Sequence, residues 1–230
     1  MLAVADPLTT PAYDVRDIAR LVGITPQRAR RWVQGYQFTS SAGEKVSPPL
    51  LYQGTDTASF LDLMELVYAN AFLDNGYSLK QVRKALEEAR LVTKQAHPFA
   101  SRQLWLSPND IYLSLRLDDS AGEAELRSLL HAGQTGIGPV ILAISDQVVF
   151  GDDGLIHEWY PRGKSVPVII DPKHLGGQPR IEGTRIPTWT LTSLWRAENH
   201  SVEAVAQAYG LTPDQVRAAI DFEQVVSDAA

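Results

Sequence analysis

The sequence contains no cysteine. Without thiols the chain can build neither a disulfide framework nor a thiolate metal site, and their absence is typical of a protein in a reducing cytoplasm. The longest apolar run, about residues 140–144, is too short to cross a bilayer. The first twelve residues have neither the basic nor the apolar stretch of a secretion signal. We therefore expect a cytoplasmic protein with no membrane partner.

The chain also lacks the short motifs that identify common enzyme sites. It has no Gly-x-Ser-x-Gly nucleophile elbow, no dinucleotide fingerprint and no phosphate-binding loop. No two histidines are spaced as ligands of one metal ion. The five histidines are His97, His131, His157, His174 and His200. We therefore expect no enzymatic activity, no metal site and no cofactor.

Basic residues outnumber acidic ones only in the first third of the chain. The formal net charge is -6 at pH 7. Residues 13–95 hold 11 Lys or Arg and 9 Asp or Glu, whereas residues 96–230 hold 10 and 17. Phosphate groups attract the basic part and repel the acidic part. The distribution favours a small DNA contact in the first third and a protein partner for the remainder.

Hydrophobic periodicity predicts a mainly α-helical protein with small β elements. Residues 1–12 contain two prolines and no periodicity, so we expect a flexible tail. Residues 13–95 and 166–230 show helical spacing, whereas residues 96–165 show short strand patterns. We therefore expect two helical domains joined by a small α+β connector.

Two segments, residues 18–31 and 205–218, share the pattern of a helix-turn-helix. In each, a helix rich in small residues ends at a glycine, an apolar residue follows, and Thr-Pro opens the next helix. Glycine accepts the left-handed backbone that ends a helix, threonine caps the next helix, and proline suits its first position. The chain therefore contains two copies of one turn, at Gly23 and at Gly210.

The helix expected over residues 25–34 is basic on one face only. On a helical wheel its apolar residues Ala29, Trp32 and Val33 share one arc. The opposite arc holds Gln27, Arg28, Arg30, Arg31 and Gln34. Arginine binds phosphate or pairs with guanine, and glutamine can pair with adenine. The arc by itself fits a DNA-binding surface and a solvated charged face equally well, whereas the preceding turn and the wing expected after it favour DNA binding.

A turn-rich stretch over residues 36–54 follows this helix and predicts a small hairpin, or wing. Residues 60–74 and 78–95 have the spacing of two further amphipathic helices. A Ser-x-x-Gln capping box opens the second of these helices, and Pro98 stops it. The first third is therefore expected to be a winged helix-turn-helix.

The connector shows a mixed pattern. Residues 103–106 and 111–115 predict two strands, and residues 123–131 predict a short helix. Residues 148–150 and 155–159, on either side of Gly-Asp-Asp-Gly, predict a hairpin.

Four aromatic residues of the connector admit two interpretations. They are Trp105, Tyr112, Trp159 and Tyr160. They could line a pocket for a small molecule, or they could form the core of a small sheet. The sequence fits both interpretations equally well.

The second helix-turn-helix, residues 201–226, presents a different surface. Its second helix carries Asp214, Asp221 and Glu223, which phosphates would repel. The same helix has a broad apolar arc of Val216, Ala219, Ile220 and Phe222. This arc is wider than one small domain needs to bury, so we expect Val216, Ile220 and Phe222 at a partner or dimer interface.

Glycines and prolines punctuate the loop at residues 176–187 and predict a tightly specified path. Arg180 and Arg185 in this loop are candidate contacts to a partner. The favoured alternative is a structural loop in which the two arginines pair with Glu182 and Asp171.

Residues 13–95 resemble the MerR-type winged helix-turn-helix. The resemblance rests on Tyr-Asp-Val-Arg-Asp-Ile-Ala at residues 13–19, on the wing, and on residues 60–82 with their Leu-Asp-Asn-Gly-Tyr-Ser-Leu-Lys-Gln-Val ending. It implies a dimer that binds a pseudo-palindromic operator.

This resemblance also implies roles for individual residues. Arg28 and Arg31 would contact bases or phosphates, and Lys45 would contact DNA from the wing. MerR-type regulators usually dimerise through a long helix that follows the fourth one. Because Pro98 ends that helix early here, we expect the homodimer contact to lie elsewhere.

Residues 166–225 resemble a small helical domain common in VapB-type antitoxins. The hallmark Gly-x-Pro-x-Ile-x-Gly-Thr-Arg-Ile-Pro occurs at residues 177–187. The helical pattern Glu-x-Val-Ala-x-x-Tyr-x-Leu-x-x-x-x-Val-x-x-Ala-Ile occurs at residues 203–220. The resemblance implies an antitoxin that is encoded beside a PIN-like ribonuclease toxin.

We therefore interpret the chain as the antitoxin of a type II toxin-antitoxin system. Its MerR-like domain would bind operator DNA and repress its own operon, and its acidic remainder would neutralise a PIN-like ribonuclease. One alternative is a MerR-like transcriptional regulator that responds to a small molecule bound by residues 99–165. Another is a protein–protein adaptor with two degenerate helix-turn-helix units.

Overall fold

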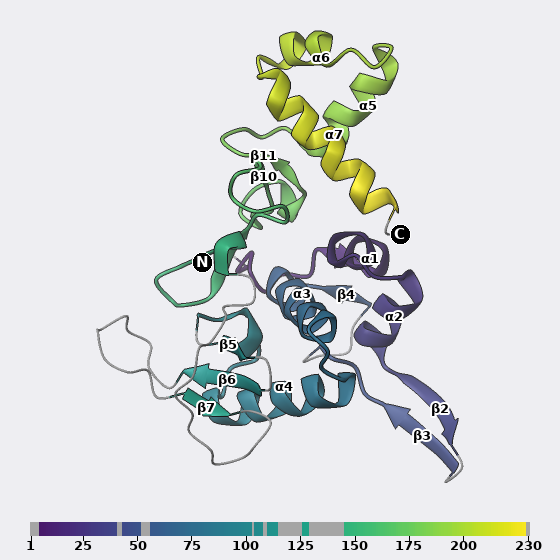
Figure 1. The fold of residues 1–230 in the computed structure, drawn as a ribbon, viewed down its shortest axis with the longest axis vertical. Coiled ribbons are helices and arrows are strands. Elements are labelled where there is room, and N and C mark those ends of the chain that lie inside the picture. The colour runs from purple at the N-terminus through teal and green to yellow at the C-terminus, as the bar shows by residue number, and fades with distance from the viewer. Residues whose placement is uncertain are drawn as a thin grey trace.

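The protein is mainly α-helical with small β elements, as expected from the sequence. The computed structural model describes residues 5–40, 43–51, 56–102, 104–107, 110–114, 126–128 and 145–228. Within these ranges there are seven α-helices and several small antiparallel sheets. Figure 1 shows the last three helices at one end of the molecule and the first four nearer the other. Buried apolar side chains from both groups belong to one continuous core.

The first two helices form the expected helix-turn-helix. α1 (Val15–Val22) begins with a capping box at Asp14 and ends at Gly23, which has a left-handed φ of 74°. α2 (Pro26–Gln34) begins at Thr25, whose hydroxyl accepts a hydrogen bond from a backbone N–H of the first turn. The sequence signals for the turn are therefore confirmed.

The predicted wing is a hairpin of β2 (Tyr36–Ser40) and β3 (Gly43–Ser47). The strands are antiparallel, with Tyr36 opposite Ser47 and Phe38 opposite Lys45. The hairpin projects from the body of the molecule (Figure 1).

A two-stranded antiparallel sheet joins the start of the helix-turn-helix to the segment that precedes the third helix. β1 (Tyr13–Asp14) pairs with β4 (Thr57–Ala58). Just before β1, the expected tail contributes Leu8 to the core, where it is 4% exposed. The carbonyl of Leu8 accepts a hydrogen bond from the N–H of Leu61 at 3.2 Å. Among residues 1–12, the described part is therefore anchored to the fold.

The next two helices also match their sequence signals. α3 (Phe60–Asp74) starts with a capping box at Ser59, and α4 (Leu79–Thr93) starts with the predicted one at Ser78. α3 is the most buried helix of this part, because apolar residues occupy nearly its whole circumference.

α4 ends at Thr93, where Lys94 adopts a left-handed φ of 55°. The chain then forms a short 3-10 turn, η1 (Pro98–Ala100), against α3. The ring of Phe99 meets the ring of Phe72 edge-on, with centroids 5.2 Å apart. Residues 94–102 therefore provide no long helix of the kind through which MerR-type proteins dimerise.

The connector begins with a three-stranded antiparallel sheet. Its strands are β5 (Leu104–Ser107), β6 (Asp110–Ser114) and β7 (Leu126–Ser128), in that spatial order. The first two strands confirm the prediction. The helix expected over residues 123–131 is wrong, because β7 lies within that range and pairs with β6. Backbone hydrogen bonds along this ladder outweigh a local helical preference.

The second connector hairpin is present where predicted. β8 (Val148–Phe150) pairs with β9 (Ile156–Trp159). Trp159 then exchanges two backbone hydrogen bonds with Ile170, at 2.8 and 2.9 Å. These bonds join the hairpin to the strand pair of β10 (Val168–Ile169) and β11 (Arg180–Ile181).

Three helices complete the fold: α5 (Thr188–Ala197), α6 (Val202–Tyr209) and α7 (Pro213–Asp228). α6 ends at Gly210, whose φ of 65° repeats the left-handed turn seen at Gly23. The last helix, α7, packs along α5 and α6 and reaches α1 at its C-terminal end (Figure 1). The second helix-turn-helix is therefore present and rests on the first.

Candidate nucleic-acid interface and partner surface

The outer face of α2 carries the predicted DNA-binding side chains. Ala29, Trp32 and Val33 are buried, with at most 2% of their surface exposed. The polar residues of the opposite arc are all exposed: Gln27, Arg28, Arg30, Arg31 and Gln34. The predicted division of this helix into two faces is therefore confirmed.

Aromatic rings restrict two of these arginines. The guanidinium carbon of Arg28 lies 5.9 Å from the centre of the Trp32 ring, and that of Arg31 lies 4.9 Å from the centre of the Tyr36 ring. Cation–π attraction between each guanidinium and its ring favours a conformation in which the arginine side chain lies along the surface of the protein. Both guanidinium groups keep N–H donors available for an anion.

Gln34 is less available than the sequence indicated. Its amide donates a hydrogen bond of 2.6 Å to the carboxylate of Asp56. Asp56 places a negative charge at the C-terminal end of α2. Any anion would therefore be attracted more strongly to the arginines than to this end of the helix.

The wing leaves α2 through Gly35, at a place where only glycine fits. Gly35 has a φ of 74°, and a Cβ there would lie 2.7 Å from the carbonyl oxygen of Ser47. Arg83 of α4 then fixes the base of the wing. It donates hydrogen bonds to the hydroxyl of Ser47 at 2.6 Å and to the carbonyl of Pro48 at 2.7 Å. Burial lowers the pKa of Arg83. No pattern in the sequence predicted this role of Arg83, because its partners lie about 35 residues away along the chain.

One face of the wing combines aromatic and basic side chains. Tyr36 and Phe38 are two residues apart on β2, so they share a face, and their ring centroids are 5.7 Å apart. Lys45, the predicted wing contact, is exposed and lies opposite Phe38 in the ladder. Phe38 is 41% exposed. The arginine-bearing face of α2 therefore continues through Arg31 and Tyr36 onto the wing.

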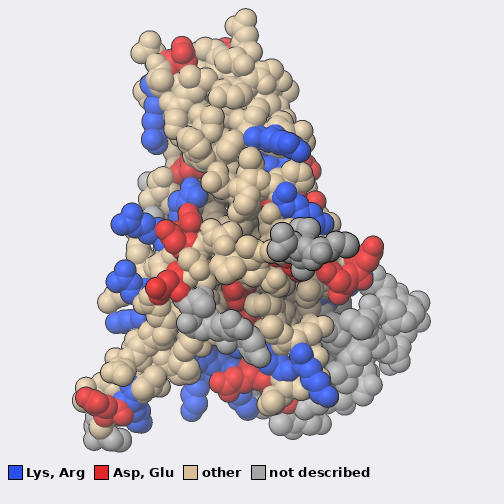
Figure 2. Space-filling model, turned by 180° about the vertical axis from the view of Figure 1, so that it is seen from behind, with Lys and Arg blue, Asp and Glu red and all other residues tan. Residues whose placement is uncertain are grey.

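The surface around α2 has mixed charge. Figure 2 shows Lys and Arg side chains along the edge of the molecule above the projecting wing, with Asp and Glu side chains among them. Glu44 lies in the β2–β3 ladder, and Asp56 accepts a hydrogen bond from Gln34 of α2. Acidic side chains therefore limit the extent of the basic area.

The apolar arc of α7 is not a free interface. Val216 is 0% exposed, Ile220 is 5% exposed and Phe222 is 2% exposed. The structure accounts for the breadth of this arc without a partner, because α7 is covered on several sides, by α5, α6, α1 and the β10–β11 strands. The position of these three residues in the described structure therefore gives no support to their assignment to a partner or dimer interface.

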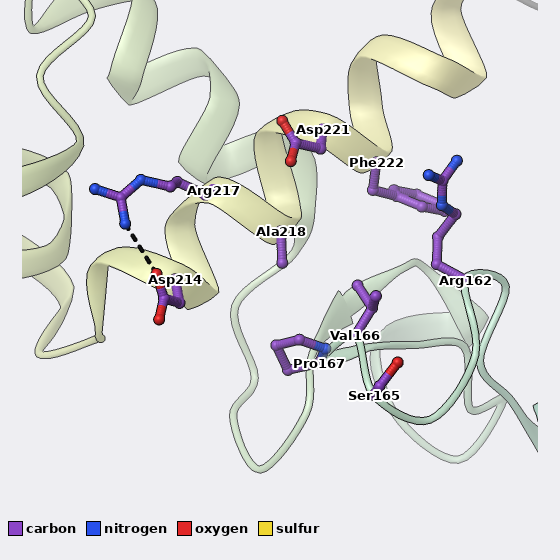
Figure 3. Close-up of a pocket in the computed structure, with 9 residues that line it drawn as sticks. All are labelled: Arg162, Ser165, Val166, Pro167, Asp214, Arg217, Ala218, Asp221 and Phe222. Carbon is purple, nitrogen blue, oxygen red and sulfur yellow. Dashed lines mark hydrogen bonds and ion pairs between the residues drawn. The ribbon is translucent and has the colours of Figure 1, made fainter.

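Figure 3 shows how the remaining surface of α7 is arranged. A loop at residues 162–167 forms one side of a pocket, and Asp214, Arg217, Asp221 and Phe222 of α7 line the other side. The intervening pocket has a volume of about 290 Å³. The guanidinium of Arg217 pairs with Asp214 at 2.8 Å. The outer face of α7 is therefore charged, with acids and a base side by side.

Glu223 differs from the two exposed acids of α7. It is 8% exposed and pairs with Arg20 of α1, with 3.1 Å between Nη1 and Oε2. The hydroxyl of Thr188 donates a hydrogen bond of 2.5 Å to its other oxygen. Glu223 therefore joins the two halves of the protein and adds nothing to the acidic surface proposed from the sequence.

The loop at residues 176–187 is held by an internal ion pair. Arg180 is 7% exposed, and its guanidinium lies 3.3 Å from the carboxylate of Asp171. It also donates to the carbonyl of Thr184 at 2.9 Å. The structural interpretation of Arg180 is confirmed, and its assignment to a partner surface is wrong. Arg185 is exposed, and Glu182 instead accepts a hydrogen bond from Tyr160.

Of the four aromatic residues considered for a ligand pocket in the connector, the structure describes the side chains of Trp159 and Tyr160. Trp159 and Tyr160 are 3% and 6% exposed and belong to the packed interior. The side chains of Trp105 and Tyr112 lie outside the described residues, as does His131. Within the described part of the chain, no group of three His, Asp or Glu side chains is placed to hold a metal ion. No described helix is both long and apolar enough to cross a membrane.

Comparisons with known proteins agree with this architecture. Residues 168–222 match the family described as "Protein of unknown function (DUF433)". The chain is 25% identical to the Mycobacterium tuberculosis protein named "Putative antitoxin VapB45" over 92% of this chain and 93% of that protein. It is 23% identical to uncharacterized protein Rv2308 of the same organism, over 96% of this chain and 93% of the relative.

The crystal structure of Rv2018 from Mycobacterium tuberculosis has a similar fold. It superimposes with a TM-score of 0.60 and 19% sequence identity, covering 92% of this chain and 98% of that one. At this identity the likeness concerns the fold alone.

Proposed function

We propose that this protein is an antitoxin that neutralises a PIN-like ribonuclease toxin and represses its own operon by binding operator DNA. The single observation that carries the proposal is the length of the similarity to the VapB45 protein. It spans 92% of the chain and so includes both the α2 surface and the residues 168–222 that match DUF433. A relative that shared one domain would support only half of this function.

The geometry of α2 supports the DNA-binding half. Three exposed arginines on one face of a docked helix, next to a projecting hairpin, have the charge and reach to contact a phosphate backbone and a groove. A pseudo-palindromic operator needs two such helices, so we propose a homodimer. Its contact lies outside α4, which ends at Thr93.

The C-terminal third supports the toxin-binding half. Its outer α7 face carries Asp214 and Asp221, which disfavour nucleic acid. It also contains the segment that matches DUF433. We assign toxin neutralisation to this third and operator binding to residues 13–95.

Each half has its own test. Fluorescence anisotropy with DNA from upstream of the gene should give tight binding that weakens steeply between about 50 and 200 mM salt. A scrambled duplex of equal length should bind far more weakly. Equal affinity for both duplexes would refute the operator assignment.

For the toxin half, the gene beside this one would be expressed alone and together with this chain. Growth arrest that this chain relieves, with a complex on size-exclusion chromatography, is the expected result. Failure to relieve the arrest, or to form a complex, would refute the antitoxin assignment and leave operator binding to be judged separately.

A further inference from the structure

A groove lies where the two halves of the protein meet. Its volume is about 360 Å³. One wall comes from the start of the first helix-turn-helix, and the other from the loop before α5 and the first turn of α5. The lining residues that matter here are Tyr13, Asp17, Arg20, Leu175, Gln178 and Trp189.

Two large apolar side chains of this groove are open to solvent. Trp189 is 52% exposed and Leu175 is 38% exposed. Tryptophan is the residue most enriched at the energetic centre of protein interfaces, and leucine adds apolar area beside it. Within residues 168–222 the exposed large hydrophobic side chains of the described structure are Leu175, Trp189 and Tyr209, and of these Leu175 and Trp189 line the groove.

Backbone conformation and hydrogen bonds define the wall of the groove at residues 175–189. Leu175, Gly176 and Gly177 have consecutive positive φ values of 52°, 62° and 78°. A non-glycine residue in this region is strained, and such strain persists only where the surroundings hold it. The hydroxyl of Tyr13 donates a 3.0 Å hydrogen bond to the carbonyl of Gly177. The indole N–H of Trp189 donates one of 3.3 Å to Gln178.

The rim of the groove is negative. Arg20 is close to Glu223, at 3.1 Å, and more distant from Asp17, at 3.9 Å. Arg20 therefore faces two carboxylates, so the three groups together carry a net charge of -1, and the Asp17 side chain at the rim is 42% exposed. A ligand that fits both features would have an apolar group beside a cation.

We infer that this groove is where the nuclease partner docks, through a segment that places an apolar side chain against Trp189 and Leu175 and a Lys or Arg beside Asp17. The inference rests on the proposed function for the existence of that partner, and it deepens it by naming the binding surface. Both halves of the protein line the groove. A partner bound there therefore touches α1, the helix on which the DNA-facing α2 packs.

The test is calorimetric titration of the full chain with the co-encoded partner protein. Trp189→Ala and Leu175→Asn should each weaken binding about tenfold or more, since both remove the apolar anchor. Asparagine is chosen because it tolerates the left-handed backbone of position 175. Asp17→Asn should weaken binding mainly at low salt, since it removes only a charge.

The matched controls are Tyr209→Ala and Asp152→Asn. Tyr209 is 39% exposed on α6, and Asp152 is exposed between β8 and β9, so each control makes the same kind of change at a position outside the groove. Both should bind the partner as the unchanged chain does. Circular dichroism would verify that every variant is folded.

The possible results separate the two proposals. If the unchanged chain binds but the groove variants bind equally well, the groove is not the docking site, while the antitoxin assignment stands. If the groove variants change self-association on light scattering and leave partner binding unaltered, a second copy of this chain occupies the groove and the inference is overturned. If the unchanged chain binds no partner, the proposed function fails, and the occupant named here fails with it.

Discussion

Arg20 of α1 and Glu223 of α7 form an ion pair across 203 residues of sequence, with 3.1 Å between Nη1 and Oε2. The side chain of Glu223 is 10% exposed and that of Arg20 is 27% exposed, so the pair lies at the edge of the contact between the two halves. Arg20 lies in the basic third but its charge is neutralised, and Glu223 lies on the acidic helix but faces inward. The pair fixes the C-terminal helix against the helix-turn-helix that carries the α2 arginines.

We predict that Glu223→Ala destabilises the protein by about 2–3 kcal/mol. The change leaves Arg20 and the hydroxyl of Thr188 without their buried acceptor. Leaving buried donors unpaired lowers the free energy of unfolding by more than the net contribution of the hydrogen bonds themselves. Urea unfolding followed by far-UV circular dichroism measures the difference. The control is Glu203→Ala on α6, which removes an exposed pair with Arg217 at 3.7 Å. That change should cost less than about 0.5 kcal/mol. Equal effects of the two changes would contradict the assigned role of Glu223.

Gly177→Ala should destabilise the contact between the halves more than Gly176→Ala does. Both glycines have positive φ, so both changes pay about 1 kcal/mol of backbone strain. A Cβ at Gly177 would also overlap the hydroxyl of Tyr13, which is 3% exposed and cannot move aside freely. At Gly176 a Cβ meets nothing within 4 Å. We expect a total loss of about 2–4 kcal/mol at Gly177, measured by thermal unfolding. A smaller loss at Gly177 than at Gly176 would show that Tyr13 yields easily.

Stability should depend on pH through His97. Burial lowers its pKa, and Arg90 does so to a smaller extent, but the carboxylates of Glu65 and Asp62 raise it more, so the pKa lies above the ordinary 6.5. Nδ1 is 3.5 Å from Asp62 and 3.8 Å from Glu65. Because the pKa of His97 is higher in the folded state than in the unfolded state, protonated His97 stabilises the fold. This stabilisation is fully present at a pH below the pKa of the unfolded state, and it is lost as the pH rises through the pKa of the folded state. The stability difference between the unchanged chain and His97→Gln should therefore shrink from about pH 5.5 to pH 9.

The control for this prediction is Ser101→Ala, which removes a buried hydrogen bond of 2.7 Å to the carbonyl of Pro98 and no titratable group. Its cost in unfolding free energy should therefore vary little over the same pH range. NMR titration of the His97 ring gives the direct measurement, and a midpoint below 6.5 would refute the prediction.

Arg28→Ala and Arg31→Ala should each weaken operator binding and make its salt dependence shallower. Each lost phosphate contact lowers the slope of log affinity against log salt by about one. Arg31→Ala also releases the ring of Tyr36 at the root of the wing. Arg196→Ala, an exposed arginine on α5 far from α2, is the control and should bind normally. Unchanged affinity and slope in the α2 variants would exclude this helix as the DNA-contacting surface.

Local signals in the sequence were sufficient for most helices and for the turns. The caps at Asp14, Thr25 and Ser78, and the glycines at positions 23 and 210, act on neighbouring backbone atoms, so their effect is visible in the sequence alone. The two faces of α2 follow from helical spacing for the same reason. The helix expected at residues 123–131 failed because strand pairing with β6 depends on a segment elsewhere in the chain.

Charge and hydrophobicity along α7 could not reveal which of its faces would be covered. The amphipathic pattern correctly predicted a helix, but burial of Val216, Ile220 and Phe222 required the packing of α5, α6 and α1 around it. The pairing of Glu223 with Arg20, and of Arg180 with Asp171, likewise depended on distant segments meeting. The sequence by itself determined the helices, the turns and the basic face of α2, because these follow from interactions within a few residues. Only the tertiary structure decided which side chains remain exposed for a partner, because exposure depends on every segment that packs nearby.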